Sequence, residues 1–312
     1  MKTRTIVLGA DGGGTKTLGI LADASGKEIA RRQVGTGNPN VAGIDGSATN
    51  IVDLLAGCCE AAGCDPADLG AVVLGLAGAG SAPIRERLTD RIQGILRDRG
   101  IPEPALQIET DARIALEGAF GGGPGAIVIA GTGSVVLGKS ADGATLMIGG
   151  WGRVMGDEGS GYFMGVETVK QIAREMDGRA PASLLRALAQ ERHGWTVREK
   201  LITAVYQDKF ELPSLAPMVM EAAGRGDDAA LRILQHGAEL LTEQVAVFAS
   251  TLPPGQPVGI VFVGGLIAGE TIYAGVFAET LRRSIPRVEV RTPLLPPAEG
   301  AVLMAVQLLQ GR

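Results

Sequence analysis

Three successive glycines between two apolar runs constrain this chain more than any other feature of its sequence. The apolar runs at 5–8 and 18–22 predict two strands, which makes the glycines the tip of a β-hairpin. Without Cβ atoms, the backbone of such a tip can bend sharply and its N–H groups can converge on an anion. The spacing differs from that of a P-loop, which leads into a helix. The sequence therefore predicts an anion-binding hairpin tip made of Gly12, Gly13, Gly14, Thr15 and Lys16.

The side chains at this tip suit phosphoryl transfer. Asp11 supplies a carboxylate that can hold a hydrated Mg²⁺, while Thr15 and Lys16 supply a hydroxyl and an ammonium group. A hairpin turn that binds nothing is the alternative that this segment alone leaves open, because glycine turns between strands are common.

Length and charge narrow the class of protein. A chain of 312 residues can form two domains, each with its own core. The net charge is −5 and the two signs are interspersed, which argues against nucleic acid or an anionic membrane as partner. No apolar run approaches the ~18 residues of a spanning helix, so we expect a cytoplasmic protein. The cysteines, Cys58, Cys59 and Cys64, lack metal-site or disulfide spacing and are expected to be reduced.

Apolar periodicity predicts a βββαβαβα order in the first part of the chain. Strands separated by helices pair in parallel and the first hairpins are antiparallel, so we expect a mixed sheet in an α/β fold. The strands are expected at 5–8, 18–22, 28–34, 71–76 and 106–110, with helices at 46–62, 83–99 and 111–120. The order begins again at 125, which suggests a duplicated core. Its later elements are strands at 125–130, 135–139, 145–148, 258–263 and 288–291, with helices at 270–283 and 298–309.

The second half carries two further glycine turns. One lies between apolar strands, so the two hairpin tips could hold different phosphates of one nucleotide; it consists of Gly131, Thr132, Gly133 and Ser134. The other, Gly264-Gly265, follows a buried strand and precedes a helix, where backbone can approach a flat ligand. A plain strand-to-helix turn is equally compatible with this second pattern.

Two more segments could carry chemistry. Asp111 directly follows a strand, so its carboxylate is expected at the strand's carboxyl end, where it could deprotonate an alcohol. A helix N-cap is the alternative role for Asp111.

The loop 149–161 contains six glycines, a tryptophan and two adjacent carboxylates. Trp151 could stack on the C–H face of a sugar or could belong to the core.

With these motifs in this order, the sequence resembles the N-acetylglucosamine kinase group of the BadF/BadG/BcrA/BcrD ATPase family, within the sugar kinase, Hsp70 and actin superfamily. The likeness spans nearly the whole chain. It implies two actin-like, ribonuclease H-like lobes with a nucleotide cleft between them. The lobes would comprise 1–110 with 297–312, and 111–296. It also implies ATP and Mg²⁺ as cofactors and transfer to the 6-hydroxyl of an amino sugar, N-acetylglucosamine or glucosamine.

The resemblance assigns roles to individual residues. Asp111 matches the general base and Asp11 the carboxylate on the magnesium side. The first and second phosphate loops correspond to Gly12–Lys16 and Gly131–Ser134, and the adenosine loop to Gly264-Gly265. The positions that correspond to contacts with the amino sugar are Asn40, Gly150, Trp151, Asp157 and Glu158.

Some features of the family are missing from this sequence, and alternative functions remain open. Activator ATPases of this family, which act on a partner protein without a sugar, bridge a [4Fe–4S] cluster with cysteines near the second phosphate loop. This chain has no cysteine after Cys64. The segment 39–43 lacks the tryptophan that vertebrate-type kinases place near the acetyl group, so a muramic sugar is a further candidate substrate. A sugar-sensing regulator would need a DNA-binding segment, and none precedes Asp11. The resemblance also allows a homodimer.

Overall fold

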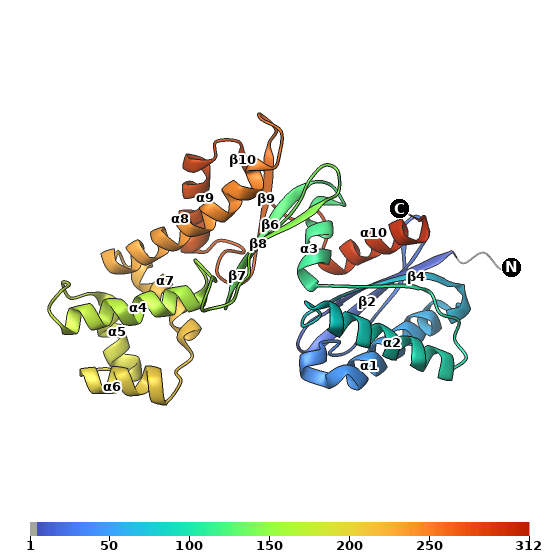
Figure 1. The fold of residues 1–312 in the computed structure, drawn as a ribbon, viewed down its shortest axis with the longest axis horizontal. Helices are drawn as coiled ribbons and strands as arrows, with labels where there is room; N and C mark the ends of the chain where they lie inside the picture. The colour runs from blue at the N-terminus through green and yellow to red at the C-terminus, as the bar shows by residue number, and fades with distance from the viewer. Residues whose placement is uncertain (1–4, 312) are drawn as a thin grey trace. The chain divides into compact units, whose positions relative to one another are not determined.

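The computed structural model describes residues 5–311, which form two compact units. Unit 1 extends to Pro124 and resumes at Pro293, and unit 2 is Gly125–Thr292. Figure 1 shows both units, coloured along the chain. The boundary expected at 110/111 falls 14 residues before the observed one, because the helix that begins at Asp111 packs against the last helix and belongs to unit 1. The boundary expected at 296/297 falls four residues after the observed one.

Unit 1 is built on a mixed five-stranded sheet in the order β3-β2-β1-β4-β5. β1 pairs antiparallel with β2 and parallel with β4, so its residues are hydrogen-bonded on both sides. This double pairing extends β1 well past the predicted end at Leu8. The strands are β1 (Ile6–Gly12), β2 (Lys16–Asp23), β3 (Glu28–Gly35), β4 (Leu69–Leu76) and β5 (Ala105–Glu109).

Helices cover both faces of this sheet (Figure 1). They are α1 (Pro39–Ala62), α2 (Ala82–Asp98), α3 (Asp111–Phe120) and α10 (Pro297–Leu309), with a 3₁₀ turn at Pro66–Asp68. Alternation along β1 explains the two layers, because successive side chains point to opposite faces. Leu8 belongs to the core under α1 and α2, whereas Val7 belongs to the core with α3 and α10.

Unit 2 repeats the same topology, as the predicted duplication requires. Its sheet has the order β10-β9-β6-β7-β8, with antiparallel pairing around β7 and parallel pairing around β9. β6 therefore occupies the place of β1, and β9 the place of β4. The strands are β6 (Gly125–Ala130), β7 (Ser134–Lys139), β8 (Thr145–Gly149), β9 (Val258–Val263) and β10 (Val288–Arg291).

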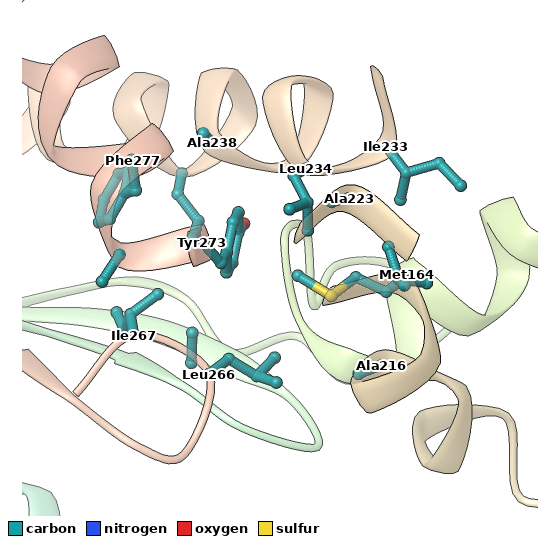
Figure 2. Close-up of a cluster of buried hydrophobic side chains, with 14 of the residues drawn as sticks. Met164, Ala216, Ala223, Ile233, Leu234, Ala238, Leu266, Ile267, Tyr273 and Phe277 are labelled. Carbon is teal, nitrogen blue, oxygen red and sulfur yellow. The ribbon is translucent and has the colours of Figure 1, made fainter. Parts of the chain in front are cut away.

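A largely helical insertion separates β8 from β9. Its helices are α4 (Gly161–Met176), α5 (Leu184–His193), α6 (Arg198–Ile202), α7 (Ala216–Gly224) and α8 (Asp228–Ser250), with a π-helical turn at Thr203–Gln207 and a 3₁₀ turn at Leu212–Leu215. α9 (Ile272–Ser284) follows β9. Figure 2 shows part of the shared core, with Tyr273 and Phe277 of α9 beside Leu234 and Ala238 of α8. Within the described part of the chain, no helix is long and apolar enough to span a membrane.

Candidate functional site

The first hairpin tip has the predicted location, between β1 and β2. The Gly13 N–H donates to the Lys16 carbonyl at 2.9 Å, which closes the turn. The Thr36 hydroxyl donates to the Gly13 carbonyl at 2.7 Å and ties the tip to the segment after β3. The tip is therefore a fixed element of the sheet edge and not a loose loop.

Gly14 is a glycine that the chain's own structure does not require. Its φ lies outside the left-handed region, and a Cβ added there would meet no atom of the described residues within 4 Å. Gly12 differs, because a Cβ there would lie 2.5 Å from Leu76. A glycine with neither a strained backbone nor a close neighbour is what a tip needs if an external anion approaches its backbone.

Two carboxylates lie close together beside this tip. Burial and the nearby Asp111 carboxylate raise the pKa of Asp11 above its usual value, and the Lys16 ammonium partly opposes the shift. Asp11 is half-buried at the end of β1, whereas Asp111 is exposed. Two like charges at the same edge of the sheet are unfavourable for the free protein, and a cation between them or beside them would relieve the repulsion.

The structure separates the two roles considered for Asp111. Thr110, not Asp111, is the N-cap of α3, since its side chain accepts a hydrogen bond from the Arg113 N–H at 3.1 Å. Asp111 is the first helical residue, and one carboxylate oxygen accepts from the Ala112 N–H at 2.9 Å. The exposed carboxylate is thus held in place at the helix N-terminus without serving as the cap.

The raised pKa of Asp11 leads to a prediction about stability. Asp11→Asn removes a half-buried charge that Asp111 repels, so the free energy of unfolding is expected to rise at neutral pH. A raised native pKa means that stability is lost as pH rises from the ordinary value of 3.8 through the native one. The advantage of the Asn variant should therefore be complete above the native pKa and absent below 3.8. Denaturant unfolding of both proteins at several pH values measures this, and a destabilised variant at pH 7 would contradict it.

Asn40 lies near the same edge, in a setting that the sequence did not reveal. α1 begins at Pro39, seven residues before its predicted start, because Asn38 caps it and the helix continues across a kink at Gly43. Gly78, in the turn after β4, has a φ of +84°, and a Cβ there would lie 2.4 Å from Asn38 and 2.8 Å from Asn40. Gly78 was missed because a lone glycine after a strand resembles any other turn.

The second tip lies between β6 and β7, as predicted, and Asp157 is bonded to it. The Gly131 N–H donates to the Gly133 carbonyl at 2.9 Å, and the Ser134 N–H donates to Asp157 Oδ1 at 3.1 Å. Asp157 has a φ of +62°, which is rare for a residue with a side chain. Backbone strain of this kind costs about 1–3 kcal/mol and is found most often at functional sites.

In the glycine-rich loop 149–161, both carboxylates accept hydrogen bonds from the protein, whereas the tryptophan is exposed. Glu158 accepts a hydrogen bond from Gln244 of α8 at 3.0 Å, and its carbonyl accepts from the Ser134 hydroxyl at 2.7 Å. Trp151 is 69% exposed, so it is not a core residue. Val154 and Met155 are also exposed. The anchored carboxylates and the exposed Trp151 belong to one loop, with the indole available to a ligand.

Gly264 and Gly265 lie next to the second tip, since they follow β9, the parallel neighbour of β6. The Leu266 N–H donates to the Ala130 carbonyl at 3.2 Å. Gly264 has a φ of +95°, and a Cβ there would lie 2.4 Å from that carbonyl. Gly265, like Gly131, would meet nothing of the described chain within 4 Å. Gly264 therefore serves the turn, while Gly265 and Gly131 leave backbone open to a ligand.

A polar cavity of about 770 Å³ opens beside the second tip. Thr132 and Asp157 line one side of it, and Tyr206, Lys209 and Glu211 line another. No motif in the sequence indicates this wall, which comprises the end of a π-helical turn and the residues after it, including Lys209 at a φ of +52°. π-Helical turns and left-handed non-glycine residues both occur often at functional sites, so this wall belongs to the candidate site.

The predicted site residues thus form two groups, one per unit. In unit 1, the first tip, Asn40 and the carboxylates Asp11 and Asp111 lie along the edge formed by the carboxyl ends of β1, β4 and β5. In unit 2, the second tip, Gly264-Gly265 and the loop that carries Trp151 lie at the corresponding edge. Among the described residues, no group of three or more His, Cys, Asp or Glu side chains could hold a metal ion.

Comparisons with known proteins agree on the class. The model of the BadF/BadG/BcrA/BcrD ATPase family matches residues 8–305. The N-acetylmuramic acid/N-acetylglucosamine kinase of Clostridium acetobutylicum is 29% identical over 96% of this chain and 97% of that protein. The glucosamine kinase of Vibrio cholerae is 29% identical over 74% of this chain and 76% of that protein. A solved structure from Chromobacterium violaceum, provisionally assigned as an N-acetylglucosamine kinase, has a TM-score of 0.67 at 25% identity, covering 97% of this chain and 99% of that one.

Proposed function

The chain belongs to the BadF/BadG/BcrA/BcrD ATPase family, and within it we propose an ATP-dependent amino-sugar kinase. The reaction is transfer of the γ-phosphoryl group to the 6-hydroxyl of N-acetylglucosamine or glucosamine. The pair of carboxylates beside the open first tip carries this proposal, since phosphoryl transfer to an alcohol needs a base and a charge partner for the phosphates at one place. Full-length relatives that are named as kinases of such sugars support it.

Asp111 is the general base of the proposed reaction. Its exposed carboxylate accepts the proton of the sugar hydroxyl as that oxygen bonds to the γ-phosphorus. The bond between the γ-phosphorus and the β,γ-bridging oxygen breaks, and the electron pair leaves with ADP. The Ala112 N–H keeps one carboxylate oxygen occupied, so the other is the proton acceptor.

Magnesium fits the acidic edge of unit 1. Mg²⁺ prefers oxygen ligands and is held by one or two carboxylates together with substrate phosphates, which agrees with two neighbouring aspartates and no larger cluster among the described residues. Asp11 would hold the hydrated ion. Burial and the neighbouring Asp111 carboxylate raise the pKa of Asp11, and a bound cation would offset both effects by neutralising its charge. When bound, the ion supplies charge stabilisation for the β- and γ-phosphates.

The remaining candidate site residues are assigned to binding of the nucleotide and of the sugar. The open backbone at Gly14 and Gly131 receives phosphates, and Gly265 with the neighbouring cavity receives the nucleoside. Gly150, Trp151, Asp157 and Glu158 contact the sugar, together with Asn40. Asp157 joins the two functions, because it also accepts a hydrogen bond from Ser134 of the second phosphate tip.

A phosphorylation screen tests the function and the sugar together. Purified protein, ATP and Mg²⁺ are incubated with glucosamine, N-acetylglucosamine, N-acetylmannosamine, muramic sugars and glucose, and ADP release is coupled to product analysis by mass spectrometry. We expect ADP release that depends on an amino sugar and yields its 6-phosphate. Steady ATP hydrolysis without any sugar would instead indicate the activator type of ATPase, and sugar binding without a phosphorylated product would indicate a regulator.

A further inference from the structure

A second cavity of unit 2 lies between α4 and α8, and its walls are rich in cations. Its volume is about 710 Å³, within the range of roughly 300–1,000 Å³ that is typical of small-molecule sites. Both helices belong to the insertion between β8 and β9, and none of the predicted site residues lines the cavity. Its charged side chains include Lys170, Arg174, Arg179, Arg232, Glu167 and Glu239. We call it the α4–α8 groove.

The charge of the α4–α8 groove is opposite to that of the chain. Four cationic side chains face two carboxylates, in a chain whose net charge is −5. Lys170 pairs with Glu167 at 2.7 Å, and Arg179 pairs with Asp177 at 2.7 Å. Within residues 5–311, Arg174 and Arg232 form no ion pair. Arg174 belongs to the α4 wall of the groove and Arg232 to the α8 wall.

We propose that the α4–α8 groove binds a phosphate-bearing small molecule that regulates the kinase; the regulatory part rests on the proposed function. Two guanidinium groups from facing helices present planar sets of donors, which match phosphate oxygens better than ammonium groups do. Gln235 adds a neutral polar group to the same wall. The ligand is a phosphorylated sugar or free phosphate, which share this chemistry.

Both helices connect the groove to the candidate site. The first N–H of α4, at Gly161, donates to the Gly131 carbonyl of the second tip at 2.8 Å. His236 lines the groove and packs edge-on against Phe163 in the first turn of α4, with ring centroids 5.4 Å apart. The next residue of α8, Gly237, packs so closely on the glycine-rich loop that a Cβ on Gly159 would lie 2.6 Å from its carbonyl. A ligand that contacts both Arg174 and Arg232 therefore acts on helices that contact the glycine-rich loop and the second tip.

Binding is tested on the full chain without ATP, by calorimetry with inorganic phosphate and with glucosamine 6-phosphate. The double variant R174Q/R232Q is expected to bind more weakly, roughly tenfold for each charge-assisted hydrogen bond that the substitutions remove. The matched control R282Q/R283Q makes the same change of charge at exposed arginines in the last turn of α9 and should bind like the wild type. Hydrogen exchange should show ligand-dependent protection of 167–179 and 229–239 in the wild type.

Each outcome decides a separate part of the proposal. Tighter binding of glucosamine 6-phosphate identifies a sugar phosphate as the ligand, and equal binding shows that free phosphate suffices; either result supports the site. Unchanged affinity in R174Q/R232Q, or an equal loss in the control, overturns it.

Regulation is tested by kinetics. The KM for the amino sugar should change with inorganic phosphate in the wild type and not in R174Q/R232Q. A wild-type KM that is the same with and without bound phosphate overturns the regulatory part. An inactive kinase would leave the binding result intact, so the two failures can be told apart.

Discussion

Replacing Asp111 by Asn is expected to lower turnover by a factor of about 10² to 10⁴ while ATP still binds. The amide keeps the shape of the side chain and can accept a hydrogen bond from the Ala112 N–H, but it cannot take a proton from an alcohol. α3 should remain intact, because Thr110 caps it. Steady-state kinetics with the best amino sugar, combined with nucleotide titration, measures both quantities.

Asp228→Asn is the matched control for this experiment. Asp228 is also the exposed first residue of a helix whose cap is the preceding residue, so the substitution removes the same charge from the same helical position. Its turnover should match the wild type. Full activity in Asp111→Asn would end the assignment of the base, and loss of nucleotide binding in that variant would show that Asp111 acts on the phosphates instead.

Gly14→Ala is expected to weaken ATP binding roughly 10- to 100-fold and to leave stability nearly unchanged. The added Cβ enters open space in the free protein, so the free energy of unfolding should move by less than about 0.5 kcal/mol. It lies where a phosphate would meet the tip, and losing one charge-assisted hydrogen bond costs about 1.5–3 kcal/mol. Nucleotide titration and thermal unfolding together distinguish this result from simple misfolding.

Gly94→Ala provides the comparison for that substitution. Gly94 lies inside α2, and a Cβ there also meets nothing within 4 Å of the described chain. ATP should bind this variant normally, and the helix should gain up to about 1 kcal/mol from the exchange of Gly for Ala. Unimpaired ATP binding in Gly14→Ala would mean that the first tip is only a hairpin turn, which is the simpler interpretation of the glycines.

The local pattern of apolar residues and glycines was enough to predict many of the strands and helices and both hairpin tips. Strands β6, β9 and β10 and helix α3 begin and end at the predicted residues, because each is a short apolar or amphipathic run with glycine, proline or a capping residue within two positions of each end. The duplicated strand order also follows from the sequence, since the glycine turn recurs at the same place in each half.

What the sequence could not supply depends on residues distant in the chain. Asp157 was expected only to contact the sugar, and its hydrogen bond with Ser134 joins positions 23 residues apart. The early start of α1 depends on a cap and a glycine kink that interrupt the helical period. Lys209 looks ordinary in sequence, and its left-handed backbone follows a π-helical turn at a point where the Phe210 N–H donates back to the Ala204 carbonyl at 2.9 Å. Periodicity does not report such tertiary constraints.

The position of α10 has a consequence for biosynthesis. The face of the first sheet that includes Val7 and Val73 is buried by residues near the end of the chain, such as Val302. A Cβ on Gly9 would lie 2.3 Å from the Val302 nitrogen, so the backbone of α10 packs directly on the backbone of β1. On the ribosome, the first strands emerge long before this partner, and their apolar face stays uncovered by α10 while the rest of unit 1 and all of unit 2, Gly125–Thr292, are synthesised. Unit 1 can therefore be completed only after unit 2 has been synthesised, and a chaperone that shields the early strands would have its greatest effect during that delay.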